Sequence, residues 1–115
     1  MNVNQLQPIP AESIRVRFSV SQRRKVPAEA GCYVLASFDN YVLYVGLTDS
    51  LRRRFGEHNE DVGKCAVVDG RKVFWFYFIP MPVTQVARVE RGWQNQFSSL
   101  HGSLPPFNRI ASPVR

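Results

Sequence analysis

Two apolar runs near the middle of the chain form its clearest pattern. Cys32 to Ser37 and Tyr41 to Leu47 are rich in aromatic and branched side chains, and Phe38-Asp39-Asn40 separates them. Asp and Asn favour tight turns because they tolerate positive φ and bond to nearby backbone groups. The pattern therefore predicts a β-hairpin.

The register of this hairpin depends on where its loop falls. With Asp39-Asn40 as a two-residue loop, the expected cross-strand pairs are Phe38 with Tyr41, Leu35 with Tyr44, and Tyr33 with Gly46. We then expect Tyr33 and Tyr44 on one face of the hairpin, with Gly46 leaving room there for something to approach. Cross-strand packing of two aromatic rings explains the same tyrosines without any function.

A helix is expected directly after the hairpin. Leu51 and Phe55 mark its apolar stripe, and Thr48 is a natural N-cap. Arg54 and His58 are four residues apart, which makes them neighbours on the helix surface. Both project from the edge of the apolar stripe rather than from the solvated side.

The second half of the chain predicts one strand and one helix. Residues 73–79 form the most apolar run, typical of a central strand buried on both faces, and a polar loop over 59–72, with a short strand at 65–68, precedes it. A helix is expected over 83–100, because apolar residues recur there in steps of three and four, at Val83, Val86, Trp93, Phe97 and Leu100. The proline-rich tail at 104–108 suits neither a helix nor an inner strand. The predicted fold class is α/β (α+β), a small, mainly antiparallel sheet flanked by helices.

Residues 1–27 have a different character. Apolar and polar residues alternate from Ile14 to Val20, which predicts an edge strand over 14–20. Basic side chains gather in the same segment, at Arg15, Arg17, Arg23, Arg24 and Lys25. We interpret 1–27 as a basic N-terminal arm and 28–115 as the folded domain. The alternative is a solvated, partly mobile arm without the strand.

The overall charge narrows the class of partner. The 115 residues include 15 Lys and Arg against 9 Asp and Glu, a formal net charge of +6. This balance favours a polyanionic partner, with nucleic acid first and an anionic membrane surface second. No apolar run approaches the roughly 18–20 residues of a membrane span, and no secretory signal is visible. The two cysteines form neither a disulfide framework nor a CxxC pair, so we expect a reducing cytoplasm.

Glu90 interrupts the apolar stripe of the second helix. Burying a carboxylate costs several kcal/mol unless a cation or hydrogen-bond donors compensate. Arg54, another arginine or a metal ion should therefore face Glu90. A structural salt bridge is the alternative to a functional site. Because Arg54 is an anomaly of the same kind on the first helix, the two together indicate a polar site between the helices and the sheet.

The order of these residues resembles the GIY-YIG endonuclease family. Gly31-Cys32-Tyr33 stands where the family has Gly-Ile-Tyr, and Tyr44-Val45-Gly46 where it has Tyr-Ile-Gly. The family's arginine, histidine, glutamate and asparagine fall on Arg54, His58, Glu90 and Asn108. The resemblance spans residues 31–108. Its departures, which include Ser50 where an asparagine is common, remove no group that the chemistry needs.

The resemblance implies a role for each residue. Tyr33 would be the general base, His58 would take its proton or position the water, and Tyr44 would orient the phosphate or the water. Arg54 would bind the scissile phosphate, Glu90 would hold one Mg²⁺ or Mn²⁺ ion, and Asn108 would donate to backbone or phosphate at the rim. Gly31, Gly46 and Thr48 would be structural, and non-specific phosphate contacts would come from Arg52, Arg53, Arg23, Arg24 and Lys25.

The implied function is hydrolysis of phosphodiester bonds in nucleic acid, with DNA favoured over RNA, by a monomer or homodimer that does not bind membranes. Two alternatives explain the same residues. One is a nucleic-acid-binding module that keeps the scaffold without hydrolysis. The other is a small interaction protein in which the tyrosines and Glu90 only pack.

Overall fold

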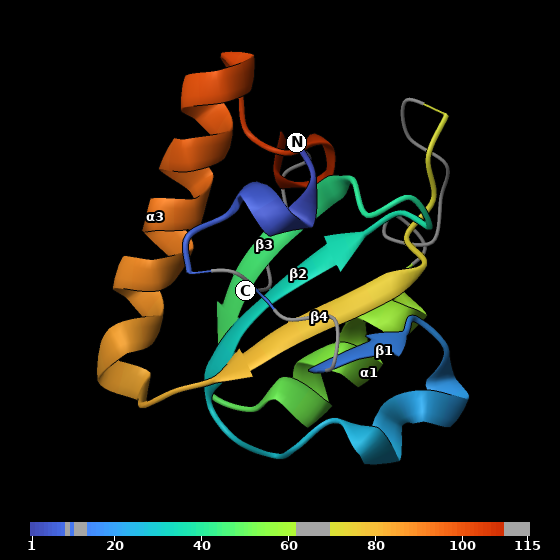
Figure 1. Ribbon diagram of the computed structural model, residues 1–115. Coiled ribbons are helices and arrows are strands. Elements are labelled where there is room, and N and C mark those ends of the chain that lie inside the picture. The colour runs from blue at the N-terminus through green and yellow to red at the C-terminus, as the bar shows by residue number, and fades with distance from the viewer. Residues whose placement is uncertain (9, 11–13, 62–69, 110–115) are drawn as a thin grey trace.

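The computed structural model describes residues 1–8, 10, 14–61 and 70–109. Over these residues the chain forms one antiparallel sheet with the strand order β1-β4-β2-β3 (Figure 1). The strands are β1 (Arg15–Arg17), β2 (Gly31–Ala36), β3 (Val42–Thr48) and β4 (Trp75–Pro80). The helices of the same residues are α1 (Leu51–Glu60) and α3 (Val83–His101), with the 3₁₀ helices η1 (Val3–Gln5), η3 (Val20–Lys25) and η4 (Pro106–Arg109). The predicted fold class is confirmed.

The hairpin β2–β3 has the predicted register but a different loop. Leu35 pairs with Tyr44 and Tyr33 with Gly46, as expected. Ala36 then pairs with Val42, so that β3 contains one extra residue at this point, a β-bulge. The expected pair of Phe38 with Tyr41 is therefore wrong. The loop is longer than two residues because the backbone bonds of Ser37 close it, by donating to the carbonyl of Tyr41 and accepting from the amide of Asn40.

The central strand is β4, which pairs with β1 on one side and β2 on the other. It begins at Trp75, two residues after the start of the predicted run. Its inner position confirms the expectation of a central strand. The short strand predicted at 65–68 lies outside the described residues.

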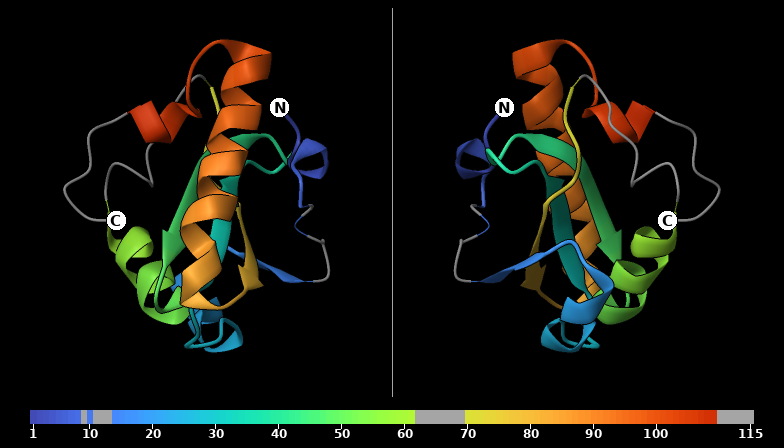
Figure 2. Two further views of the ribbon diagram at one scale, coloured as in Figure 1. Left: turned by 90° about the vertical axis from the view of Figure 1, so that its left-hand side faces the viewer. Right: turned by 90° about the vertical axis from the view of Figure 1, so that its right-hand side faces the viewer.

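The sheet separates two apolar layers. One contains the N-terminal residues Met1, Val3 and Leu6 together with α3, and the other contains α1 with Phe76 and Phe78 of β4. The side views in Figure 2 show η1 and α1 on opposite sides of the sheet. Alternate residues of β2 enter different layers, since Cys32 and Val34 belong to the first and Tyr33 to the second.

Helix α1 is capped by Ser50, not by Thr48 as predicted. Ser50 has an extended backbone, and its hydroxyl accepts from the amide of Arg53 at 3.4 Å. Thr48 is still the last residue of β3, and its hydroxyl bonds to both backbone groups of Ser50. The strand thus continues one residue further than the sequence pattern suggested, and Thr48 holds the cap residue in place.

Helix α3 occupies the predicted span but buries less of its stripe. Val86, Trp93 and Phe97 are buried, whereas Val83 is 61% and Leu100 is 57% exposed. Only the middle of α3 packs against the rest of the protein, so the apolar stripe in the sequence is longer than the buried part of the helix. None of the helices in the described part of the chain is long and apolar enough to span a membrane.

The two ends of the chain pack on the sheet. The expected edge strand exists, but it covers only 15–17, and Val20 is 70% exposed because it already belongs to η3. Val26, between η3 and β2, is fully buried in the layer of α1. The proline-rich tail forms the short helix η4, since proline without an amide hydrogen is tolerated at the first helical position.

Candidate active site

Strand β2 and helix α1 bring Tyr33 and His58 into direct contact. The Tyr33 hydroxyl and His58 Nε2 are 2.6 Å apart, and the tautomer of the imidazole decides which of the two donates. Tyr33 is fully buried, and His58 is 4% exposed. A short hydrogen bond between a phenol and an imidazole gives the site a pair that can pass a proton.

Tyr44 completes an aromatic group around this pair. Its ring centroid lies 6.0 Å from that of Tyr33 and 5.3 Å from that of His58. On its other side, Tyr33 stacks on Phe76 of β4 with a centroid distance of 5.2 Å. The expectation that both tyrosines line one face of the hairpin is confirmed by these contacts, and the phenol of Tyr33 is held in a fixed position.

Gly46 makes room for Tyr33 itself. A Cβ atom at residue 46 would lie 2.5 Å from both Cζ and Oη of Tyr33, much closer than packed atoms approach. The space that the sequence suggested for an approaching group is therefore filled by the phenol of Tyr33. Gly31 has a comparable role at the start of β2, since a Cβ there would collide with the carbonyl oxygen of Ile79 and with the side chain of Leu51.

Burial controls the protonation of Tyr33. The loss of solvent raises its pKa well above the usual value, and the charges of Tyr44 and Glu90 raise it further, while Arg54 acts in the opposite direction. A phenol in this environment keeps its proton unless a neighbouring group accepts it. His58 Nε2 is in position to do so.

Arg54 is a buried cation, and contacts with the described residues use only some of its hydrogen-bond donors. Its side chain is 7% exposed, and Nη1 lies 3.0 Å from Oε1 of Glu57, three residues along α1. Among the described residues, the buried Nε of Arg54 has no hydrogen-bond partner. A guanidinium held on one side by Glu57, with an unused buried donor, is suited to bind an anion. Glu57 was not among the predicted site residues, although its i,i+3 spacing from Arg54 is a signal for the ion pair.

Glu90 reaches the site from a different direction than expected. It is half-buried on α3, whose apolar residues pack in the layer opposite Tyr33, and α3 runs along the β3 side of the sheet (Figure 1). The expectation that this carboxylate is buried between the helices and the sheet is met only in part, because Glu90 is half-buried on a helix that packs against both β2 and β3, the edge strand. Gln94 Nε2 donates to its Oε2 at 3.0 Å. Its charge makes a small contribution to the raised pKa of Tyr33.

Cys32 is a core residue of the layer that contains α3. Its thiol donates to the carbonyl oxygen of Val86 on α3 at 3.2 Å. Burial raises the pKa of the Cys32 thiol to about 12, and the nearby charge of Glu90 contributes to the shift. The thiol is therefore protonated and inert at neutral pH, as expected of a small buried side chain.

Asn108 acts on the backbone of the strand that carries Tyr44 and Gly46. Its Oδ1 accepts from the amide of Val45 at 2.8 Å, and its Nδ2 donates to the carbonyl of the same residue at 2.9 Å. These bonds satisfy the outer edge of β3, which no other strand of the described sheet covers. Of the two contacts expected for Asn108, the structure therefore has the one to backbone, and we regard Asn108 as a positioning residue.

The basic side chains that were predicted to contact phosphates differ in how far other groups of the protein already engage them. Arg53 pairs with Asp49 at 2.6 Å and lies 3.6 Å from Glu57, and Arg52 Nε donates to the carbonyl of Val26. Arg23, Arg24 and Lys25 are exposed on η3, which packs beside α1. Arg23 also lies against Gly56, where a Cβ atom would be 2.9 Å from its Cζ. The basic segment thus borders the helix that carries Arg54.

The carboxylates of the described residues do not gather into a metal cluster. No group of three or more His, Cys, Asp or Glu side chains suited to a metal ion occurs in this part of the chain. Glu90 is the acidic side chain whose charge contributes to the raised pKa of Tyr33. A site with a single protein carboxylate suits Mg²⁺, which keeps several waters and binds through one or two carboxylates plus substrate phosphate.

Comparison with protein families agrees with this geometry. Residues 29–102 match the family model described as the GIY-YIG catalytic domain. The match contains Tyr33, Tyr44, Arg54, His58 and Glu90. A search of curated proteins found none that matches the chain.

Proposed function

The chain belongs to the GIY-YIG family, whose domains are generally nucleases, and we propose that it is an endonuclease that hydrolyses phosphodiester bonds in DNA with one divalent metal ion. The observation that carries this proposal is the 2.6 Å contact between Tyr33 and His58, buried beside the cation Arg54. A purely structural core has no need for three such groups together. Packing alone would be served better by apolar residues of similar volume.

Tyr33 is the general base in this proposal. Its raised pKa disfavours a free phenolate, so its proton must move to His58 Nε2 as the phenol oxygen takes a proton from the attacking water. This transfer requires the neutral imidazole with its own hydrogen on Nδ1. Tyr44, in ring contact with both groups, orients the water or the phosphate.

Arg54 balances the charge that builds on the phosphate. Its guanidinium is desolvated, so its attraction for an anion is stronger than that of an exposed arginine. Glu57 fixes the guanidinium from one side and leaves the Nε donor for the substrate. Binding of a phosphate would therefore satisfy an atom that the described residues leave unpaired.

Glu90 is the residue that would hold the metal ion. One half-buried carboxylate at the edge of the site fits the ligand preference of Mg²⁺ or Mn²⁺. When bound, such an ion supplies Lewis-acid stabilisation of a phosphate oxygen. Gln94, which donates to Oε2, orients the carboxylate.

The basic surface beside α1 supplies affinity for the substrate backbone. Arg23, Arg24 and Lys25 lie next to the helix that carries Arg54, and each phosphate that they neutralise makes binding more dependent on salt. Arg53 contributes less in this proposal, because Asp49 and Glu57 already engage its charge. Since one site cuts one strand, the expected product of a single visit is a nick.

The proposal is tested by nicking of supercoiled plasmid in the presence of Mg²⁺ or Mn²⁺. We expect Glu90→Gln and Arg54→Ala to reduce nicking by about 10²–10³-fold or more, while binding of duplex DNA in EDTA persists. Glu29→Gln, at an exposed residue outside the site, is the matched control for the loss of a carboxylate. Wild-type protein that binds DNA but leaves plasmid intact across metals and pH would contradict the proposal and favour the non-catalytic binding module.

A further inference from the structure

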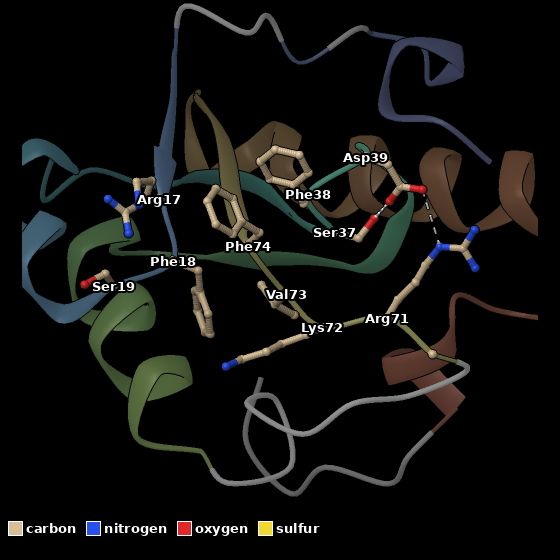
Figure 3. A pocket seen from close by; sticks show the side chains of 11 residues that line it. Arg17, Phe18, Ser19, Ser37, Phe38, Asp39, Arg71, Lys72, Val73 and Phe74 are labelled. Atoms are coloured by element: carbon tan, nitrogen blue, oxygen red, sulfur yellow. Dashed lines mark hydrogen bonds and ion pairs between the residues drawn. The ribbon is translucent and has the colours of Figure 1, made fainter.

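A pocket of about 690 Å³ opens at the hairpin end of the sheet (Figure 3). Neither Tyr33 nor His58 is among the residues that line it. It lies between the β2–β3 loop, the residues after β1 and the residues before β4. Its walls combine two exposed or half-exposed rings with three cations, namely Phe38, Phe74, Arg17, Arg71 and Lys72. The proposed catalytic chemistry uses none of these side chains.

The aromatic part of this pocket is open to solvent. Phe38 is 71% exposed at the tip of the hairpin, and its ring meets that of Phe74 edge to face at a centroid distance of 5.0 Å. An exposed phenylalanine at a loop tip leaves the apolar faces of its ring in contact with water, which is unfavourable. A flat ligand that stacks on the free face of such a ring would remove part of this contact.

The charge of the pocket is positive. Arg17 and Lys72 are exposed, and the guanidinium carbon of Arg17 lies 5.6 Å from the centroid of Phe74. Arg71 carries a buried Nε that has no hydrogen-bond partner among the described residues, although it is 3.9 Å from Oδ2 of Asp39. Asp39 is the acidic residue of the lining, and the Ser37 hydroxyl also donates to it. Three cations against one engaged carboxylate favour an anionic ligand.

The hairpin tip is held rigidly enough to present its ring. Asn40, with a φ of 66°, accepts from Arg15 Nη1 at 3.1 Å and from the hydroxyl of Tyr77. The indole of Trp75 donates to the carbonyl of Phe38 at 3.3 Å. A preorganised tip loses little conformational freedom when it binds a ligand.

The pocket continues the layer that contains Tyr33. Its inner wall includes Val73 and Phe18, which pack with the same aromatic cluster as Tyr33, and Ser37, the residue directly after β2, follows Tyr33 by four residues. At about 3.3 Å per residue, the two positions are roughly 13 Å apart along the strand. One strand of DNA, with a phosphate about every 3.4 Å of helix axis, covers that distance in a few nucleotides.

We propose that this pocket binds an unpaired nucleotide, with the base stacked on Phe38 and Phe74 and the adjoining phosphates on Arg17, Arg71 and Lys72. The ligand class is single-stranded nucleic acid, such as the free strand of a branch or an overhang. The inference rests on the proposed function only where it assigns the bound strand to the substrate of the nuclease. Binding to the pocket is independent of hydrolysis.

The test measures binding of a fluorescein-labelled oligothymidine by anisotropy in EDTA, with a blunt duplex of the same length for comparison. We expect Phe38→Ala to weaken binding of the single strand by about 5- to 150-fold and that of the duplex by less than about twofold. Phe38→Trp keeps a stacking face and should restore binding. Leu100→Ala, at another exposed apolar residue, is the matched control and should change neither affinity.

The contribution of charge is measured with the same oligothymidine. Arg17→Gln should lower the slope of log affinity against log salt by about 0.7, the value for one single-strand phosphate contact. An unchanged slope, an unchanged single-strand affinity of Phe38→Ala, or an equal loss for the duplex would overturn the inference. If no substrate is cleaved but single-strand binding depends on Phe38, the nuclease proposal fails and this one holds. If plasmid is nicked but Phe38→Ala binds the single strand as tightly as wild type, the pocket proposal fails and the nuclease proposal holds.

Discussion

The two layers of the molecule are built by alternate residues of the same strands, yet their interiors differ in kind. On the side of α3, Val34 of β2 packs with Trp93 and Phe97 in an apolar cluster. On the side of α1, Tyr33 shares its layer with two buried polar residues, His58 and Arg54. The period-2 alternation of a strand thus separates the residues that stabilise the fold from those that we assign to chemistry.

The polar layer is tolerated because its groups are paired. Tyr33 bonds to His58, and Arg54 pairs with Glu57, so most of the cost of burying them is offset. The buried Nε of Arg54 has no hydrogen-bond partner among the described residues, and its burial therefore still costs free energy. This atom lies where we propose that a phosphate binds. Stability and activity should therefore respond separately to substitutions on the two sides of the sheet.

The largest effect should come from the polar layer. Tyr33→Phe keeps the ring and its stacking on Phe76 but removes the hydroxyl that we assign as the base. We expect plasmid nicking to fall by about 10²–10⁴-fold. The free energy of unfolding should fall by only about 1–3 kcal/mol, because the buried hydrogen bond between Tyr33 and His58 is lost. Urea denaturation and nicking, measured on the same preparation, check both numbers. Nicking at the wild-type rate would remove Tyr33 from the mechanism.

The opposite result is expected from the apolar layer. Trp93 is fully buried and its indole donates to the carbonyl of Pro8, so Trp93→Ala leaves a large cavity and one unpaired acceptor. The free energy of unfolding should fall by about 3–5 kcal/mol. At a temperature where the variant remains folded, as monitored by circular dichroism, its nicking rate should stay within a few-fold of wild type. A loss of nicking as large as that of Tyr33→Phe in the folded variant would show that the layers are not separable.

Adjacent residues on β2 should give the two layers different alkaline responses. Burial raises the pKa of Cys32 from 9.0 to about 12 and that of Tyr33 well above 10.0. Above its unfolded pKa, each group ionises in the unfolded chain but keeps its proton in the native one. Stability should therefore be full below pH 9 and fall at higher pH, by at most about 1.4 kcal/mol per pH unit for each group.

Variants at these two positions assign the alkaline loss. Cys32→Ala should flatten the decline that begins near pH 9, and Tyr33→Phe should flatten only the part above pH 10. Urea midpoints measured from pH 8 to 11 give both slopes. A decline that neither variant changes would mean that other groups cause it.

Much of the fold could be predicted because local patterns specify it. The pairing of Tyr33 with Gly46 follows from two apolar strands around an Asp-Asn turn. The loop itself could not be predicted, since the bulge in β3 depends on the bonds that Ser37 makes with its own loop. The cap of α1 was misplaced for a similar reason, because only the structure shows that β3 extends to Thr48.

The geometry around the predicted site residues could be predicted only in part. Spacing brought Arg54 and His58 together, yet it could not show that α3 lies on the other layer, because both faces of β4 are apolar. Glu90 was therefore expected in a buried position between the helices, whereas it is half-buried at the edge. The role of Asn108 depends on the unpaired edge of β3, a property of strand order that no local pattern contains.

The smallest effect should occur where α3 leaves the apolar layer. Val83 and Val86 are three residues apart on one stripe, but Val83 is 61% and Val86 only 4% exposed. We expect Val86→Ala to lower the free energy of unfolding by about 1.5–3 kcal/mol and Val83→Ala to change it by less than about 0.5 kcal/mol. Urea denaturation resolves this difference, and each variant serves as the control for the other. Equal losses would mean that the first turn of α3 is packed against another surface in solution, so that the apolar layer extends further along the helix than the fold of this chain alone requires.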